Sequence, residues 1–413
     1  METPTMTDQF GSSSKAIPAD LVGAATEELI GRNIFDGTFL SPLVVLRATA
    51  IEHNLATMRD FCLANRVELA PHAKTTMASS LISRQTAHGA WAITVANAVQ
   101  ARTLFNHGLR RLLIANQLVN EASIEWAFEA AAQGLELYCF ADSHDGLARL
   151  DRDHAGKVSV LVEIGGSGGR SGVRDIELAL SLAEAAAAME AVRFAGVAGY
   201  EGVFLSARDH AGRRRVREYL RFLGDAFERI ASCGLCEPTA SPILTAGGSA
   251  CFDDVADILG PVAEAHDAKL VLRSGCYITH DSGFYQEVSP LRDHAEFAAF
   301  RPALEAIAQV VSRPEPTLAL LDLGKRDVSF DEGPPVPLWC YEQTRRHPAP
   351  ESWRVSRLMD QHTFLTVDAA DEIAVGDFVS FGISHPCTTF DKWKHIPEVD
   401  DDGTVVAVAS TEF

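Results

Sequence analysis

Short apolar runs and longer amphipathic stretches alternate from Pro42 to about Ser289, and this pattern constrains the fold of the chain more than any other feature. Strands that alternate with helices predict a parallel sheet whose strands are joined by crossover helices. The nine apolar runs are Leu43–Leu46, Val67–Ala70, Trp91–Val95, Arg111–Ala115, Leu135–Ala141, Val158–Ile164, Val192–Ala198, Pro242–Ala246 and Lys269–Arg273. If the first run lies outside the barrel, the other eight match a closed (β/α)8 barrel. A doubly wound open sheet is the main alternative.

The alternation ends after Ser289, and the remainder of the chain predicts a smaller β domain. Residues 313–350 are rich in proline and lack helical periodicity. Short strand-like runs follow at Thr363–Val367, Phe378–Ile383 and Thr404–Val408. At the other end, the first fourteen residues are polar and lack the basic start and apolar core of a secretory signal. We expect residues 1–20 to form a disordered tail.

The charge balance excludes several classes of partner. Lys and Arg total 36 against 56 Asp and Glu, which gives a formal net charge of −20. Such an acidic chain repels nucleic acid and anionic lipid, so neither is expected as a partner. No apolar stretch reaches the roughly eighteen residues that a transmembrane helix needs. The eight cysteines are scattered, which is typical of a protein in the reducing cytoplasm.

Lys74 is the strongest candidate for a catalytic residue. It lies just past the run Val67–Ala70, before a helical stretch that starts near Thr76. In a (β/α) barrel, catalytic side chains sit at the carboxyl ends of the strands. A lysine held there can form a Schiff base with an aldehyde cofactor. The alternative is that Lys74 is an ordinary solvated surface charge.

Two successive strands end in segments that suit a phosphate group. Gly247, Gly248 and Ser249 follow one strand and precede a helix, so backbone amides and a helix start can meet an anion there. The segment Ser274–Tyr277 follows the next strand and can add amides to the same site. In our count these are the loops after strands seven and eight, where such barrels usually bind phosphate. A tight turn without a ligand is the alternative.

Two further loops and one tripeptide carry candidate ligand contacts. The glycine-rich loop Gly165–Gly172 fails the spacing of a dinucleotide fingerprint, but its Arg170 can reach a heteroaromatic ring or a carboxylate. Tyr200 ends another strand and can stack on a planar ligand, unless it only caps the barrel. His385 and Cys387 are spaced i and i+2, and on an extended chain they would face one way and hold zinc in an open site.

Taken together, these motifs resemble one family over nearly the whole chain, from about Pro42 to Phe413. The motifs are Pro71-His72-x-Lys74-Thr75, Tyr200-Glu201-Gly202, Gly247-Gly248-Ser249, Ser274-Gly275-Cys276-Tyr277 and the run from His385 to Trp393. They resemble the D-serine dehydratase/D-threonine aldolase family, the metal-dependent branch of the alanine racemase-like, fold-type III pyridoxal phosphate (PLP) enzymes. The resemblance implies an alanine racemase-like barrel over 42–290, a β domain from 21–41 plus 291–413, and a homodimer.

The resemblance also assigns roles to individual residues. It implies that Lys74 forms the Schiff base with PLP, and that His385 and Cys387 hold the metal ion. The residues that it implies for cofactor binding are Lys74, His72, Arg170, Tyr200, Gly247, Gly248, Ser249, Gly275, Cys276 and Tyr277. The chain departs from the family at Thr76-Met77, where many members have His-Lys. It also has Glu163-Ile164 before the glycine-rich loop, where members often have Asp.

The implied reaction is β-elimination from a D-3-hydroxy amino acid such as D-serine, which gives a 2-oxo acid and ammonia. Lys74 would remove the α-proton, and zinc would assist departure of the hydroxyl group. The runner-up is aldolase-type cleavage to glycine and an aldehyde. Cys387 favours the dehydratase, because aldolases of this family tend to carry Asp there and a thiolate prefers zinc. A racemase, a non-catalytic PLP carrier and an NAD-binding oxidoreductase are the remaining alternatives.

Overall fold

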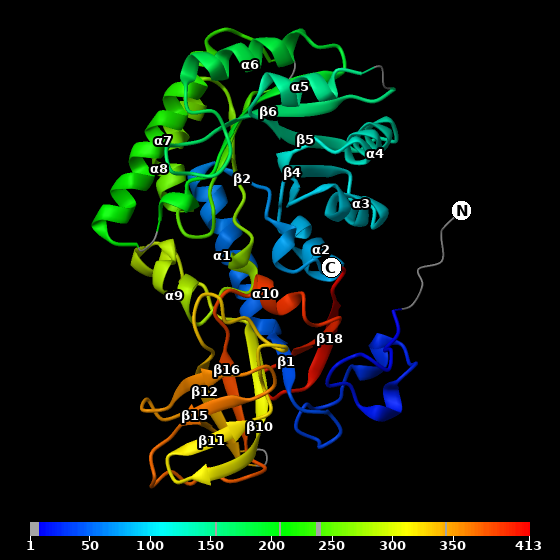
Figure 1. Ribbon diagram of the computed structural model, residues 1–413, viewed down its shortest axis with the longest axis vertical. Helices are drawn as coiled ribbons and strands as arrows, with labels where there is room; N and C mark the ends of the chain where they lie inside the picture. The colour runs from blue at the N-terminus through cyan, green and yellow to red at the C-terminus, as the bar shows by residue number, and fades with distance from the viewer. Residues whose placement is uncertain (1–7, 153–154, 206–207, 237–240, 343–344) are drawn as a thin grey trace.

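The computed structural model describes residues 8–152, 155–205, 208–236, 241–342 and 345–413. Figure 1 shows a barrel ringed by helices, with a β-rich body packed against one end of it. The barrel strands are β2 (Glu68–Leu69), β3 (Ile93–Val95), β4 (Arg111–Gln117), β5 (Glu136–Ala141), β6 (Val158–Ile164), β7 (Val192–Gly199), β8 (Ile243–Ala246) and β9 (Lys269–Leu272). They run parallel in the order β2-β9-β8-β7-β6-β5-β4-β3.

Backbone hydrogen bonds between the two end strands close this sheet into a barrel. The amide of Trp91 donates to the carbonyl of Leu69 at 2.7 Å, and the amide of Thr94 donates to the carbonyl of Pro71 at 3.0 Å. The predicted (β/α)8 barrel is therefore confirmed, and the open doubly wound sheet is excluded. Apolar side chains fill the interior, as expected of a small barrel: Ala70, Ala92, Leu113, Tyr138, Phe140, Leu161, Ala198, Ile243 and Val271.

Amphipathic helices cover the outside of the barrel. They are α1 (Ala48–Asn65), α2 (Ser79–Ala87), α3 (Ala98–Asn106), α4 (Glu121–Ala132), α5 (His144–Leu150), α6 (Ile176–Ala188), α7 (His210–Ala231) and α8 (Phe252–Ala265). In α7, Val216, Leu220 and Leu223 recur at helical spacing and are buried. Polar residues cap the amino ends of several helices. In α7, for example, the side chain of Asp209 accepts a hydrogen bond from the amide of Gly212. No helix among the described residues is long and apolar enough to span a lipid bilayer.

The second body is built on a mostly antiparallel sheet. Its strands are β1 (Leu43–Arg47), β10 (Leu304–Glu315), β11 (Leu318–Leu321), β12 (Val336–Glu342), β13 (Arg345–Pro348), β14 (Arg354–Leu358), β15 (Thr363–Thr366), β16 (Phe378–Gly382), β17 (His395–Val399) and β18 (Val405–Ser410). The order β13-β12-β16-β10-β1-β17-β18 forms its main path, and β11, β14 and β15 extend it from β10. Strand β1 lies between β10 and β17, so the first apolar run is outside the barrel.

The N-terminal segment packs on this second body. Phe10 and Ile17 are buried, and the ring of Phe10 meets the imidazole of His395 edge-on with the centroids 5.1 Å apart. Lys15 Nζ forms an ion pair with Asp327 at 3.0 Å. The expectation of a disordered tail over 1–20 is therefore wrong for residues 8–20, because apolar side chains among the polar ones anchor them. Residues 1–7 lie outside the described part of the chain.

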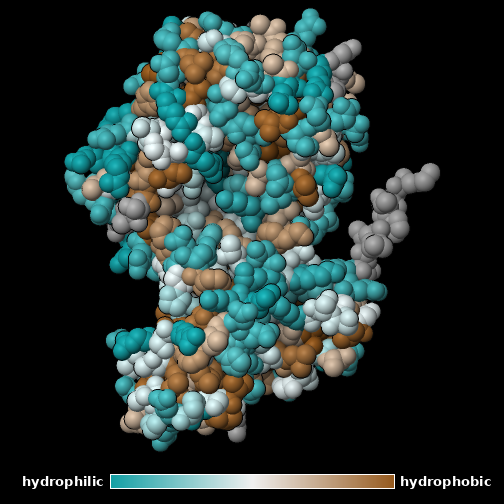
Figure 2. Space-filling view, in the orientation of Figure 1, coloured by the Kyte–Doolittle hydropathy of each residue, from teal (hydrophilic) through white to brown (hydrophobic). Residues whose placement is uncertain are grey.

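Two short helices lie where the two bodies meet. Helix α9 (Phe284–Val288) follows β9, and α10 (Cys387–Phe390) follows β16. Figure 1 shows α10 between the barrel and the sheet of the second body. Figure 2 shows mostly hydrophilic side chains on the visible face of the barrel, in keeping with the net charge of −20. The carboxyl ends of the barrel strands face the second body, and a cavity lies at these strand ends.

Candidate active site

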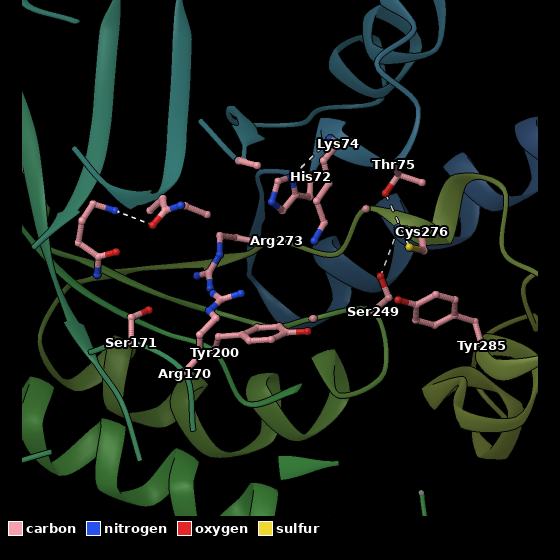
Figure 3. Close-up of a pocket in the computed structure, with 16 residues that line it drawn as sticks. His72, Lys74, Thr75, Arg170, Ser171, Tyr200, Ser249, Arg273, Cys276 and Tyr285 are labelled. Atoms are coloured by element: carbon pink, nitrogen blue, oxygen red, sulfur yellow. Dashed lines mark hydrogen bonds between the residues drawn. The ribbon is translucent and has the colours of Figure 1, made fainter. Parts of the chain in front are cut away.

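A cavity of about 360 Å³ opens at the carboxyl ends of the barrel strands. Its lining residues come from the end of β4, from the segments after β2, β3, β6, β7, β8 and β9, and from α9, and Figure 3 shows their side chains. They are His72, Lys74, Thr75, Ala96, Ala115, Asn116, Gln117, Arg170, Ser171, Tyr200, Gly248, Ser249, Arg273, Gly275, Cys276 and Tyr285. Most residues predicted to bind a cofactor are therefore brought together. Gly247 and Tyr277 are not in this lining.

Lys74 lies in a short 3₁₀ turn, Ala73–Thr75, just past β2. Its side chain points into the cavity beside His72 (Figure 3). His72 pairs with Thr94 in an isolated bridge, and its Nδ1 accepts the backbone amide of Lys74 at 3.4 Å. Burial, and then the positive charge of Lys74, holds the pKa of His72 well below its usual range. The imidazole is therefore neutral at physiological pH.

Two arginines and a tyrosine form the opposite wall. The guanidinium of Arg170 lies over the ring of Tyr200, 5.1 Å from its centroid. Burial raises the pKa of Tyr200 to about 12, so its hydroxyl keeps its proton. Arg273, which is buried, donates to Thr245 Oγ1 at 2.6 Å and to the carbonyl of Gly199 at 2.5 Å. Sequence reasoning missed Arg273 because it was counted as the end of an apolar run.

The loop after β8 is held by a buried carboxylate. Glu201 Oε2 accepts the amide of Gly247 at 3.0 Å, and its Oε1 accepts the amide of Gly248 at 2.6 Å. Gly247 has a φ of +97°, which favours glycine, and this conformation helps both amides point at one side chain. The two amides predicted to meet phosphate thus already have a partner.

Ser249 and the loop after β9 complete this side of the cavity. Ser249 Oγ accepts the amide of Cys276 at 3.2 Å, which joins the two loops. A Cβ on Gly275 would come within 2.5 Å of the carbonyl oxygen of His72, so only glycine allows this approach. Tyr277 turns away from the cavity, and its hydroxyl accepts Gln85 Nε2 at 3.2 Å.

Cys276 and Cys387 meet at the boundary between the two bodies. Their sulfur atoms are 3.5 Å apart, and the hydroxyl of Thr75 contacts both, at 3.7 and 3.5 Å. The hydrogen bond with Cys387 lowers the pKa of Cys276 to about 6, although burial opposes the shift. The same contact raises the pKa of Cys387. Tyr285 from α9 also hydrogen-bonds to Cys276.

His385 and Cys387 are not on an extended segment, so that part of the geometric reasoning is wrong. His385 has a φ of +61°, and Cys387 begins α10. Two carboxylates hold His385 in place. Asp331 Oδ2 lies 2.5 Å from His385 Nδ1, and Asp281 Oδ2 accepts its backbone amide at 2.9 Å. Within the described residues, no three His, Cys, Asp or Glu side chains are grouped to hold a metal ion.

Asp331 fixes the orientation of the His385 ring. Its other oxygen accepts Thr388 Oγ1 at 3.0 Å. Burial opposes ionisation, but the hydrogen bond with His385 holds the pKa of Asp331 below its usual range. A carboxylate on one imidazole nitrogen leaves the other for a ligand, as at many metal sites. Neither Asp331 nor Asp281 was predicted from the sequence, because nothing local marks a residue that contacts a distant loop.

Comparison with known proteins identifies the fold and the family. The family model for the alanine racemase N-terminal domain matches residues 46–255, just over half of the chain. The model for a serine dehydratase domain matches residues 303–399. The structure of D-threonine aldolase from Filomicrobium marinum superposes with a TM-score of 0.78 at 24% identity, over 92% of this chain and 97% of that one.

Two characterised relatives align with about three quarters of their length. D-threonine aldolase of Arthrobacter sp. is 28% identical over 302 residues, which is 72% of this chain and 74% of that protein. D-threo-3-hydroxyaspartate dehydratase of Delftia sp. is 25% identical over 312 residues, with the same coverage. The chain thus belongs to the alanine racemase-like family of barrel proteins, in the branch that carries a serine dehydratase domain after the barrel.

Proposed function

We propose that this protein is a PLP-dependent lyase that removes water and then ammonia from a D-3-hydroxy amino acid such as D-serine. The single observation that carries the proposal is the position of Lys74. Its amine enters a cavity of about 360 Å³ opposite the loops after β8 and β9, which contribute Ser249 and Gly275 to the lining. The relatives named above act on D-threonine and D-threo-3-hydroxyaspartate, which are amino acids of this class.

The residues around the cavity fit the predicted cofactor. Lys74 would hold the aldehyde carbon, and Arg170 and Tyr200 would face the ring. Ser249 and Gly275 would receive the phosphate, and the glycine at position 275 lets this loop approach the backbone of His72 closely. When bound, PLP supplies an electron sink for the charge that develops at the α-carbon.

The donor set at His385 and Cys387 fits an open zinc site. Asp331 contacts Nδ1 of His385, so Nε2 would be the metal ligand, together with the sulfur of Cys387. When bound, the metal supplies a Lewis acid for the departing hydroxyl group. A Cys→Ala mutant of the hydroxyaspartate dehydratase was solved in a metal-free form.

The side chains around the cavity have separate roles in the proposed reaction. Lys74 Nζ takes the α-proton of the substrate, because it is the amine that lines the cavity. His72 is neutral and adds no charge beside that amine. The second body approaches from the side of Cys387, whose sulfur contacts Thr75 next to Lys74.

Aldolase-type cleavage is the second candidate, because the relatives include aldolases as well as a dehydratase. The residue that favours the dehydratase is Cys387, since a thiolate prefers zinc whereas a carboxylate suits harder ions. Product analysis with D-threonine, PLP and zinc separates the two. 2-Oxobutyrate with ammonia supports the proposal, and glycine with acetaldehyde supports the aldolase. Lys74→Ala should abolish either reaction, and activity retained in this variant would refute both.

We also propose a cytoplasmic homodimer, with the domain division predicted above. The prediction places the barrel at 42–290 and the β domain at 21–41 plus 291–413. Strand β1 pairs with β10 and β17, which moves residues 43–47 to the β domain in our proposal. Light scattering of the purified protein measures the assembly, and a mass near 44.6 kDa would refute the dimer.

A further inference from the structure

The two sulfur atoms of Cys276 and Cys387 are in van der Waals contact at 3.5 Å. They are separated by 111 positions in the chain and come from different bodies, η5 (Cys276–Ile278) after β9 and α10 after β16. Thr75, next to Lys74, contacts both sulfur atoms. The contact between the two sulfur atoms therefore lies at the boundary between the two bodies, beside the candidate catalytic residue Lys74.

The surroundings allow a small oxidant to reach this pair. Cys276 lines the cavity, and Cys387 is only partly buried. Cys276 is itself buried, as are Cys62 and Cys139, but it lines the cavity and those two do not. A peroxide molecule is far smaller than the cavity, which holds about 360 Å³.

The geometry favours a bond between the sulfurs over a metal bridge between them. Within the described ranges, no third metal-binding side chain is grouped with these two sulfur atoms. A disulfide needs the sulfurs at about 2.0 Å, so each would move by less than about 1 Å. Side-chain rotation in a partly open cavity provides such a movement.

We propose that Cys276 and Cys387 form a reversible disulfide that switches this site off under oxidising conditions. The oxidant is a peroxide. One thiolate attacks a peroxide oxygen, the O–O bond breaks, and sulfenic acid and hydroxide form. The second thiolate then attacks the sulfenic sulfur, the S–O bond breaks, and hydroxide leaves. Two thiols and one hydrogen peroxide thus become one disulfide and two waters, and a dithiol reductant reverses the change.

The disulfide would act on the site in two ways. It converts the sulfur of Cys387 from a thiolate into a group that no longer binds zinc. It also links the loop after β9 covalently to α10. These two segments could then no longer move relative to each other when a substrate binds. The loss of activity rests on the proposed function, whereas formation of the disulfide does not.

Peptide mapping tests bond formation directly. The protein is prepared with Cys233→Ser, so that the exposed Cys233 and its neighbour Cys236 cannot form a disulfide of their own. It is treated with an equimolar amount of hydrogen peroxide, digested without reductant and analysed by mass spectrometry. We expect a linked Cys276–Cys387 peptide, a loss of two titratable thiols, and full recovery with dithiothreitol. Adding Cys276→Ser should abolish the linked peptide, and absence of that peptide from the Cys233→Ser protein would overturn the proposal.

Activity, measured on the same samples, separates the switch from the proposed function. Loss of lyase activity in proportion to the linked peptide, with recovery on reduction, supports the switch. Full activity of the completely linked protein would overturn it. If the linked peptide forms but neither the reduced nor the oxidised protein acts on D-3-hydroxy amino acids, the proposed function fails while the disulfide stands. Zinc added before peroxide should slow linkage, because a bound thiolate is a poorer nucleophile.

Discussion

The carboxylate of Asp281 connects the barrel to the candidate metal ligand of the other body. Its Oδ2 accepts the backbone amide of His385 at 2.9 Å, across 104 positions of sequence. Its Oδ1 accepts the amides of Gly283, Tyr285 and Gln286, which start helix α9. Asp281 is only 2% exposed, and burial raises its pKa against the effect of these hydrogen bonds. One buried side chain thus fixes both α9 and the unusual backbone of His385.

Asp281→Asn should weaken metal binding without unfolding the protein. An asparagine oxygen can still receive the amides of α9, but its NH₂ group would then face the amide of His385, where two donors repel each other. We expect zinc affinity to fall about tenfold, as when other supporting contacts of metal ligands are lost. Competition with a chromophoric chelator measures it, and circular dichroism checks the fold. Unchanged zinc affinity would show that His385 is not the ligand or that Asp281 does not position it.

Glu201→Gln should weaken cofactor binding. The carboxylate of Glu201 receives the amides of both Gly247 and Gly248, and a glutamine offers an oxygen to only one of them. A buried amide left without a partner costs about 1–3 kcal/mol, so the loop after β8 should shift and the dissociation constant of PLP should rise about tenfold. Absorbance titration with PLP measures it. Glu218→Gln, the same change on the exposed face of α7, should leave the affinity unchanged.

The barrel was predictable because each of its strands is a short apolar run that packs on both sides. All nine runs contain strands of the structure. The second sheet was predicted only in part. Strand β12 contains proline, and one of its antiparallel partners is β16, which lies far away in the chain. Such pairing leaves little trace in the local sequence.

The same limit applies to the candidate site. The barrel pattern predicts functional residues at the carboxyl ends of strands, and this is where Lys74, Ser249 and Gly275 lie. Glu201 and Asp281 act through contacts with segments 46 or more positions away. Their roles are set by the folded chain, and a single sequence contains no periodicity that marks them. The contact between Cys276 and Cys387 is of the same kind, since it depends on how the two bodies meet.

Phe10→Ala should destabilise the protein measurably, because the N-terminal segment is part of the folded structure. Phe10 is 1% exposed and packs on His395. Removing a buried aromatic ring costs about 3 kcal/mol or more in free energy of unfolding. Denaturant titration measures the difference. Val22→Ala, at a position 52% exposed, is the matched control and should change the free energy by less than about 0.5 kcal/mol. Equal stabilities of the two variants would indicate that residues 8–20 do not pack as described.

His280 should make the protein sensitive to acid. The side chain is 3% exposed and its Nε2 lies 3.2 Å from Gln286 Oε1. Burial lowers the pKa of His280 from 6.5 to about 4. In the unfolded chain this group therefore takes up a proton at a higher pH than in the folded protein. The stability that depends on a neutral His280 is complete above pH 6.5 and is lost as the pH falls toward about 4.

The expected loss over this interval is about 3 kcal/mol, since one pKa unit corresponds to about 1.4 kcal/mol. His280→Asn removes the titrating group, and asparagine tolerates the positive φ of +46° at this position. The unfolding free energy of both proteins is measured from pH 7 to pH 4. Other groups titrate equally in both, so the difference between the curves isolates His280. The variant should lose less stability than the parent over that range, and parallel curves would mean that His280 is protonated in the folded state as readily as in the unfolded chain.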